Sequence, residues 1–199
     1  IYAVEYRLAP ETPFPGAVED VYATLKWLQS NHQDEKIDHT RIGIAGISAG
    51  ACIAAGVTLM ARDEGFEPPI AKQILICPML DNRTATGPDH PLTEFLSWTQ
   101  SNNDLGWNAY LGQRCTNVSP YAAPARAEKL EGLPRTYIDV GGLDLFRDES
   151  IKYASRLSNA NIEVEFHLYP GVPHGWERLG PELSVTKIAA ENRIRALRT

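Results

Sequence analysis

The pattern G-x-S-x-G around Ser48 constrains this chain more than any other stretch. An apolar, strand-like run precedes it at 41–45, and a helix-like run follows it at 51–62. A serine on the turn between a buried strand and a helix adopts a strained backbone conformation, with its hydroxyl raised clear of the sheet. We therefore expect Gly46 and Gly50 to let the strand and the helix approach closely, and the helix to aim its free N–H groups at the serine.

Strand-like and helix-like runs alternate along the chain, which predicts an α/β fold with a mostly parallel sheet and helices on both faces. The expected strands are 1–7, 41–45, 72–80, 136–140 and 163–169. The expected helices are about 13–30, 51–65, 148–160 and 182–197. Residues 81–130 break the alternation and contain several aromatic side chains. They form either a surface subdomain or a cap-like insertion over a substrate pocket.

Length and charge exclude several classes of protein. The chain has 199 residues and a formal net charge of -6 at pH 7, so we expect one domain over 1–199 and no nucleic acid partner. No apolar run approaches the ~20 residues of a membrane span. Cys52 and Cys77 lie in apolar runs without metal-ligand spacing, as buried thiols do. We therefore expect a cytoplasmic location and no metal site.

A serine hydroxyl becomes a strong nucleophile when an imidazole takes its proton and a carboxylate orients that imidazole. His174 is the best candidate base, because it lies in a turn-rich loop just after the last expected strand. The other histidines fit less well. His32 and His39 precede the serine and flank a polar loop, His90 lies in the irregular segment, and His167 lies inside an alternating strand.

The best candidate for the carboxylate is Asp144, in the loop that follows the strand 136–140. An open α/β sheet places its active site at the carboxyl ends of its strands. Asp148 is the alternative, although its position at the expected start of a helix suits a capping residue. The backbone N–H of Ala49 is expected to stabilise an oxyanion. This chemistry needs neither a metal nor a cofactor.

Four motifs follow one another in the chain: Y-R-L-A-P-E at 6–11, G-I-S-A-G at 46–50, D-L-F-R-D-E at 144–149 and P-H-G-W at 173–176. Together they resemble the hormone-sensitive-lipase-like branch of the α/β-hydrolase fold, which includes many carboxylesterases. The resemblance implies a serine carboxylic-ester hydrolase that acts on small or short-acyl esters through an acyl-enzyme. It implies Ser48 as the nucleophile, Asp144 as the orienting acid and His174 as the base.

The chain departs from this family in two respects. Ile47 stands where the family usually has aspartate, and Ala51 where it often has glycine. The family's H-G-G-G loop, whose N–H groups complete the oxyanion hole, does not occur in the sequence. Because the chain begins at Ile1, inside an apparent strand that would be the family's fourth, we expect an N-terminally truncated domain with a deficient oxyanion site. We also expect a homodimer, since a truncated sheet exposes its first strand as an edge.

Two functions from different classes stay open. The first is hydrolysis of a small ester. The second is a catalytically weak or inactive module that binds a ligand or a partner on the same fold. All three triad candidates are present, which favours the enzyme, whereas the missing oxyanion loop favours the binding module. A peptidase is a third interpretation, but it would normally bring a large extra domain.

Overall fold

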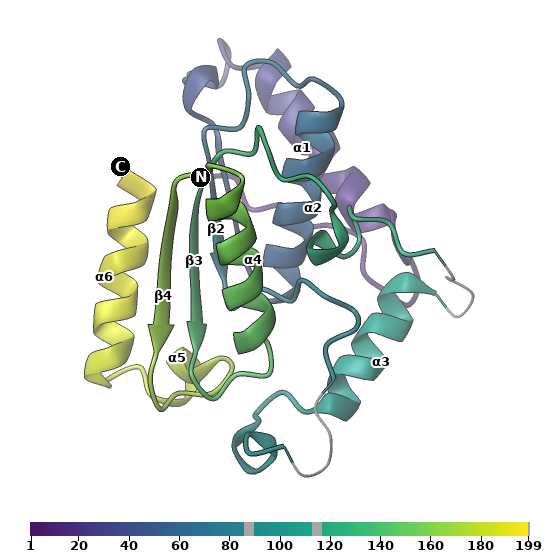
Figure 1. Ribbon diagram of the computed structural model, residues 1–199. Helices are drawn as coiled ribbons and strands as arrows, with labels where there is room; N and C mark the ends of the chain where they lie inside the picture. Colours follow the sequence, from purple (N-terminus) through teal and green to yellow (C-terminus); the bar gives the residue numbers. More distant parts are fainter. Residues whose placement is uncertain (86–89, 113–116, 199) are drawn as a thin grey trace.

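Figure 1 shows the computed structural model, which describes residues 1–85, 90–112 and 117–198. Within these residues the strands form one parallel sheet in the order β1-β2-β3-β4. Their bounds are Gly43–Ile47 for β1, Lys72–Ile76 for β2, Arg135–Gly141 for β3 and Val164–Tyr169 for β4. Because the strands are parallel, their carboxyl ends meet at one edge of the sheet, the lower edge in Figure 1.

The helices of the described residues are α1 (Gly16–Ser30), α2 (Ala49–Asp63), α3 (Gln100–Leu111), α4 (Arg147–Asn159), α5 (Trp176–Leu179) and α6 (Ser184–Arg198). Short 3-10 turns occur at His39–Arg41, Thr93–Phe95 and Pro124–Arg126. α2 and α4 pack on the face of the sheet that carries Leu75 and Ile138. α6 packs on the opposite face, where Ala196 contacts Ile74 and Tyr137. The predicted α/β fold with helices on both faces is confirmed.

The central strands are buried on both sides because helices cover both faces of the sheet. Residues Gln73 to Leu75 of β2 and Thr136 to Gly141 of β3 are all buried. The strand predicted at 72–80 is shorter than expected and ends at Ile76. Cys77 takes a φ of 38°, in the left-handed region, so the extended run stops before Pro78.

The strand predicted at 1–7 is wrong, since the structure assigns no strand to residues 1–8. A strand exists only where a neighbouring strand pairs with it, and this stretch is held by α1 instead. The backbone N–H and the guanidinium of Arg7 both donate to Asp20. A cavity of about 220 Å³ separates the stretch from β1 and is lined by Tyr2 to Val4 on one side and Gly43 to Ala45 on the other. Among the described strands, β1 is therefore an edge of the sheet.

The segment 81–130 contains α3 and packs Trp98, Trp107 and Tyr110 inward, whereas Phe95 is 53% exposed. Trp107 is buried against Leu145 and Phe146, which lie in the loop after β3. Part of the segment, at 86–89 and 113–116, lies outside the described residues. The division of the chain into one domain with a cap-like insertion stays a prediction.

A buried ion cluster fastens α6 to the sheet. The guanidinium of Arg193 donates to both carboxylate oxygens of Asp139, over 2.6 and 2.8 Å, and lies 2.6 Å from a carboxylate oxygen of Glu177. Asp139 is fully buried in β3 and also accepts a hydrogen bond from the hydroxyl of Tyr137. Burial raises the pKa of Asp139 even though Arg193 opposes this shift. Such a carboxylate depends on its cationic partner.

Replacement of Arg193 by leucine should lower the free energy of unfolding by about 3 kcal/mol, since it leaves Asp139 buried without its counter-ion. Urea denaturation at neutral pH measures this loss. The matched control is Arg195→Leu on the same helix, whose half-exposed side chain pairs with Glu165, and there we expect a loss below about 1 kcal/mol. Equal losses in the two variants would contradict the stabilising role of the cluster.

Candidate active site

Ser48 lies on the sharp turn between β1 and α2. Its φ and ψ are 56° and -117°, a conformation that is costly for a residue with a side chain. The Ser48 N–H donates to Ile76 O over 2.8 Å, and Ser48 O accepts from the N–H of Cys52. The turn is therefore fixed on one side by β2 and on the other by the first turn of α2.

The two glycines of the turn differ in how strictly the fold requires them. A Cβ added at Gly46 would lie 2.2 Å from Gly50 O, so no larger residue fits there. A Cβ added at Gly50 would meet nothing within 4 Å. The expected close approach of strand and helix therefore depends on Gly46. The prediction that Gly50 is also needed for this close approach is wrong, because a side chain at position 50 would face open space.

Asp144 and His174 follow the carboxyl ends of β3 and β4. Asp144 is fully buried, and its Oδ1 accepts a hydrogen bond of 2.9 Å from the Phe146 N–H. Its Oδ2 lies 2.8 Å from His174 Nδ1, and His174 Nε2 lies 3.0 Å from Ser48 Oγ. Because an ionised carboxylate only accepts hydrogen bonds, Nδ1 carries the proton and Nε2 is free to accept one from the serine.

The two loops that carry Asp144 and His174 are bonded to each other through their backbones. The Gly142 N–H donates to Tyr169 O over 2.7 Å, and the Leu143 N–H donates to Val172 O over 3.0 Å. A Cβ added at Gly141 would lie 2.3 Å from Val172 O, so the close contact requires glycine there. The distance from acid to base is therefore set by main-chain contacts as well as by the side-chain hydrogen bond.

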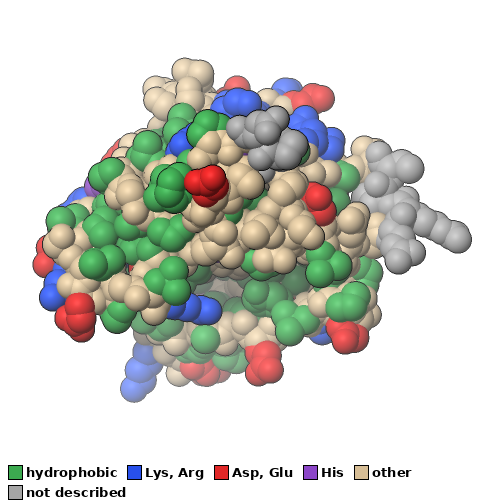
Figure 2. Space-filling view, turned by 90° about the horizontal axis from the view of Figure 1, so that it is seen from below, with side chains coloured by type: hydrophobic (Ala, Val, Ile, Leu, Met, Phe, Trp, Pro, Cys, Tyr) green, Lys and Arg blue, Asp and Glu red, His purple; other side chains and the backbone are tan. Residues whose placement is uncertain are grey.

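Aromatic side chains surround the imidazole. The ring of Phe146 meets it edge-on at a centroid distance of 5.2 Å, and the ring of Trp98 lies 6.5 Å from it. The hydroxyl of Ser97 donates to His174 O over 2.6 Å, which joins the segment before α3 to the histidine loop. Figure 2, which views the molecule from below Figure 1, shows a hollow in this face with hydrophobic side chains around it. The imidazole itself is flanked by the rings of Phe146 and Trp98.

The N–H of Ala49 is the first of α2, so no carbonyl within the helix accepts from it. Ala49 is exposed and directly follows Ser48. The positive end of the helix dipole adds to the attraction of this N–H for negative charge. The arrangement suits Ala49 as a donor to an oxyanion that forms at the serine.

The structure keeps the other candidates apart from this group. Asp148 pairs with Arg147, and its side chain is 62% exposed. It is not the capping residue that we expected, because α4 begins at Arg147 and Phe146 occupies the cap position. His167 is bonded to Glu165 and stacks on Tyr169, and His90 accepts from the Leu92 N–H.

His32 and His39 stack on each other at a centroid distance of 4.1 Å, in the polar region that follows α1. His32 Nδ1 lies 2.8 Å from Gln29 O. Neither ring takes part in the group formed by Ser48, Asp144 and His174.

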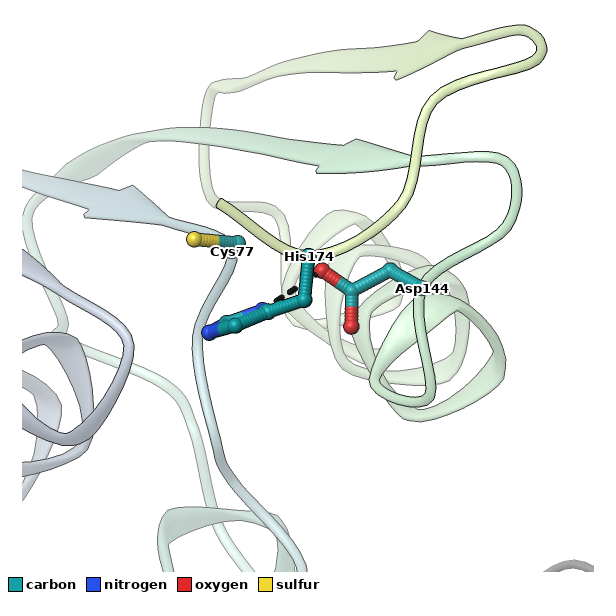
Figure 3. A group of neighbouring side chains, drawn as sticks. All are labelled: Cys77, Asp144 and His174. Carbon is teal, nitrogen blue, oxygen red and sulfur yellow. Dashed lines mark hydrogen bonds and ion pairs between the residues drawn. The ribbon is translucent and has the colours of Figure 1, made fainter. Parts of the chain in front are cut away.

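Cys77 is a neighbour of this group that the sequence did not connect with it. In the part of the chain that the structure describes, one group of three potential metal ligands was found: Cys77, Asp144 and His174. Their ligand atoms all lie within 4.8 Å of one another (Figure 3). The spacing of 67 residues between Cys77 and Asp144 follows no metal-binding motif, so only the folded chain reveals the group.

Known proteins resemble this chain over most of its length. Residues 1–178 match a family described as alpha/beta hydrolase fold. Esterase LipI of Mycobacterium tuberculosis is 36% identical over 187 residues, which cover 88% of this chain and 55% of LipI. The gibberellin receptor GID1A of Arabidopsis thaliana is 33% identical over 171 residues, which cover 83% of this chain and 49% of that receptor.

Among solved structures, a bacterial heroin esterase matches with a TM-score of 0.91 and 43% sequence identity, over 98% of this chain and 62% of the esterase. The chain therefore spans about half the length of the curated relatives described above. Within the described residues, no helix combines the length and the apolar character that crossing a bilayer requires.

Glu149 supports the site from α4 and was not foreseen from the sequence. Its side chain is buried and accepts hydrogen bonds from the N–H groups of Leu80 and Asp81 and from the hydroxyl of Thr84. It thereby ties the chain after β2 to the helix that follows Asp144. Burial raises the pKa of Glu149 to about 8, although these hydrogen bonds act in the opposite direction.

The raised pKa of Glu149 makes stability depend on pH. The folded protein keeps a proton that the unfolded chain, with a glutamate pKa of about 4.3, has already lost. The contribution of Glu149 to stability is therefore full below about pH 4 and declines as the pH rises toward about 8. Between about pH 5 and pH 8, the wild type should lose at least about 1 kcal/mol of unfolding free energy relative to Glu149→Gln.

Urea denaturation at several pH values measures this difference. The exposed Glu131, replaced by glutamine, is the control and should follow the wild type at every pH. A Glu149→Gln variant whose stability runs parallel to that of the wild type would contradict the assignment.

Proposed function

The chain belongs to the hormone-sensitive-lipase-like branch of the α/β-hydrolase family, and on this premise we propose that it hydrolyses carboxylic esters with Ser48 as its nucleophile. One observation carries the proposal. Hydrogen bonds run without interruption from Ser48 Oγ through the imidazole of His174 to the buried carboxylate of Asp144. These are the contacts that an acyl-transfer triad needs, and they join three loops at one edge of the sheet.

In the first half of the reaction, Ser48 Oγ attacks the ester carbonyl carbon while its proton moves to His174 Nε2. Asp144 Oδ2 accepts the hydrogen bond from Nδ1–H and stabilises the imidazolium that forms. The Ala49 N–H donates to the oxyanion of the tetrahedral intermediate. When the C–O bond to the alcohol breaks, His174 returns the proton to the leaving oxygen, and the acyl group stays on Ser48.

In the second half, water replaces the alcohol. His174 Nε2 takes a proton from the water as it attacks the acyl carbon, and a second tetrahedral intermediate forms. The proton then passes to Ser48 Oγ as the acyl bond breaks, which frees the carboxylic acid and restores the hydrogen bond of the resting site. Both halves use the same three side chains, so the loss of any one of them blocks turnover.

An apolar groove that includes Trp98, a neighbour of His174, supports a small or short-acyl ester as the substrate. The groove encloses about 850 Å³ and begins at Trp98, whose ring lies near His174. One side is formed by α3, with Leu105, Gly106 and Ala109, and the other by the prolines at 10 and 13. An alkyl group in this groove would gain about 0.8 kcal/mol for each buried methylene.

A second function is favoured by one relative. The protein named gibberellin receptor GID1A matches most of this chain, so the fold also occurs in a receptor. If this alternative holds, the groove described above binds a small molecule without turnover. Covalent labelling by a fluorophosphonate separates the two proposals, because only an activated serine reacts with it.

Ser48→Ala should reduce hydrolysis of p-nitrophenyl acetate by at least about 10³-fold and should abolish fluorophosphonate labelling, because the nucleophile is gone. The control is Ser158→Ala, an exposed serine on α4, which should match the wild type. Circular dichroism confirms that both variants fold. Undiminished hydrolysis by the Ser48 variant would refute the assignment.

Leu105→Asp should reduce the preference for p-nitrophenyl butyrate over the acetate by about fivefold, because a charge replaces apolar surface in the groove. Leu105 is 72% exposed, so the change should leave the fold and acetate hydrolysis intact. The control is Leu197→Asp, an exposed position on α6 outside the residues that line the groove. The ratio of kcat/KM for the two esters is the measurement, and an unchanged ratio in Leu105→Asp would contradict the location of the acyl group.

We also propose that β1 pairs with β1 of a second copy, since its outer edge is open and Ile47 is 62% exposed. Light scattering at micromolar concentration should therefore give the mass of a dimer. Ala45→Lys should give a monomer, because a charge on the edge opposes pairing. Leu168→Lys, on the opposite edge strand β4, is the control and should stay dimeric. A monomeric wild type would overturn the proposal.

A further inference from the structure

Cys77 brings a third kind of ligand atom to the acid and the base of the site. Figure 3 shows Cys77, His174 and Asp144 as neighbours that come from three segments of the chain. The potential ligand atoms all lie within 4.8 Å of one another. The proposed ester reaction uses the imidazole and the carboxylate but has no role for the thiol.

The fold holds the thiol firmly in this place. Cys77 is the first residue after β2, and its N–H donates to Asp139 O of the neighbouring β3 over 2.7 Å. Its side chain is buried, and its φ of 38° departs from the extended conformation of the strand. The backbone of Cys77 is therefore held in place, and its thiol lies beside His174 and Asp144, away from solvent.

The electric field around Cys77 attracts a cation. After burial, the largest effects that raise the pKa of its thiol come from the carboxylates of Asp144, Glu177 and Asp139. The guanidinium of Arg193 has the opposite effect and lowers the pKa of the thiol. It pairs with Asp139 and Glu177. Three carboxylates and one guanidinium therefore act on the thiol. A cation beside Asp144 would reduce this excess of negative charge.

The three donor types define which cation fits. A thiolate, an imidazole and a carboxylate are the ligands that zinc uses, whereas magnesium and calcium prefer oxygen alone. In a tetrahedral zinc site, bonds of about 2.0–2.3 Å place the ligand atoms about 3.5 Å apart. On binding, the sulfur would move closer to the other two ligand atoms, and the 2.8 Å hydrogen bond between Asp144 and His174 would be exchanged for bonds to the ion. His174 lies in a loop with Gly171 and Gly175, both in the left-handed region, and water can fill the fourth position.

We propose that Cys77, Asp144 and His174 form an inhibitory site for Zn²⁺ or another thiophilic divalent cation. The ion forms bonds to the sulfur, to one ring nitrogen and to a carboxylate oxygen. The thiol proton passes to water, and the imidazole keeps its single proton on the ring nitrogen that does not bind the ion. Since the ion then occupies the imidazole and the carboxylate, Ser48 loses its base. The inhibition rests on the proposed esterase function, whereas the binding of the ion does not.

The test measures binding and inhibition separately. Titration with Cd²⁺, followed by the ultraviolet absorption of the cadmium–thiolate bond, reports the binding. All proteins carry Cys115→Ser, so that this third thiol adds no signal. The otherwise unchanged protein should show the absorption, and Cys77→Ala should lose it. The control is Cys52→Ala, because Cys52 is equally buried but bonds to Ala122 O, so the absorption should persist there.

Inhibition is measured on p-nitrophenyl acetate with added Zn²⁺ and is reversed with a chelator. Cys77→Ala should hydrolyse the ester but need at least about tenfold more Zn²⁺ for half inhibition, whereas Cys52→Ala should match the parent. Absent cadmium absorption, absorption that survives Cys77→Ala, or equal inhibition of the parent and Cys77→Ala would each overturn the site. A chain that hydrolyses no ester refutes the esterase function alone, because the cadmium titration still decides the binding.

Discussion

The hydrogen bond between His174 Nδ1 and Asp144 Oδ2 is the interaction on which the rest of the site depends. It fixes which ring nitrogen bears the proton, and so makes Nε2 the acceptor that faces Ser48. It also satisfies a carboxylate that has no contact with solvent, together with the Phe146 N–H. Without such partners the buried charge would cost several kcal/mol. One contact thus serves both the stability of the loop and the orientation of the base.

Further charged groups connect the loop that carries His174 to the rest of the fold. Trp176 follows His174 by two residues, and the guanidinium of Arg193 lies 5.3 Å from the centre of its ring. Arg193 also holds Asp139 in β3 and Glu177 in α5. The histidine loop is therefore braced by α6, which packs on the face of the sheet opposite α2 and α4.

The sequence predicted what depends on local pattern and on the order of strands. Ser48, Asp144 and His174 each follow a strand, and parallel strands bring their carboxyl ends to one edge. It failed where the outcome depends on a distant neighbour. Residues 1–7 have the composition of a strand but lie beside α1, with no strand of the described chain to pair with them. The sequence placed Glu149 in a motif and Cys77 among the buried thiols, but it did not reveal their partners, because these lie far along the chain.

The same geometry explains why the proposed catalytic triad and the proposed cation site can coincide. An acyl-transfer triad must stabilise an imidazolium, which appears for a moment as Ser48 loses its proton. The field that does so comes from a fixed, buried carboxylate beside the ring. That field is present at rest as well, before the proton of Ser48 has moved. A divalent ion bound beside Asp144 would place a lasting positive charge next to the same carboxylate. A soft ligand would hold this ion, and the turn at the end of β2 places the Cys77 sulfur close to Asp144 and His174.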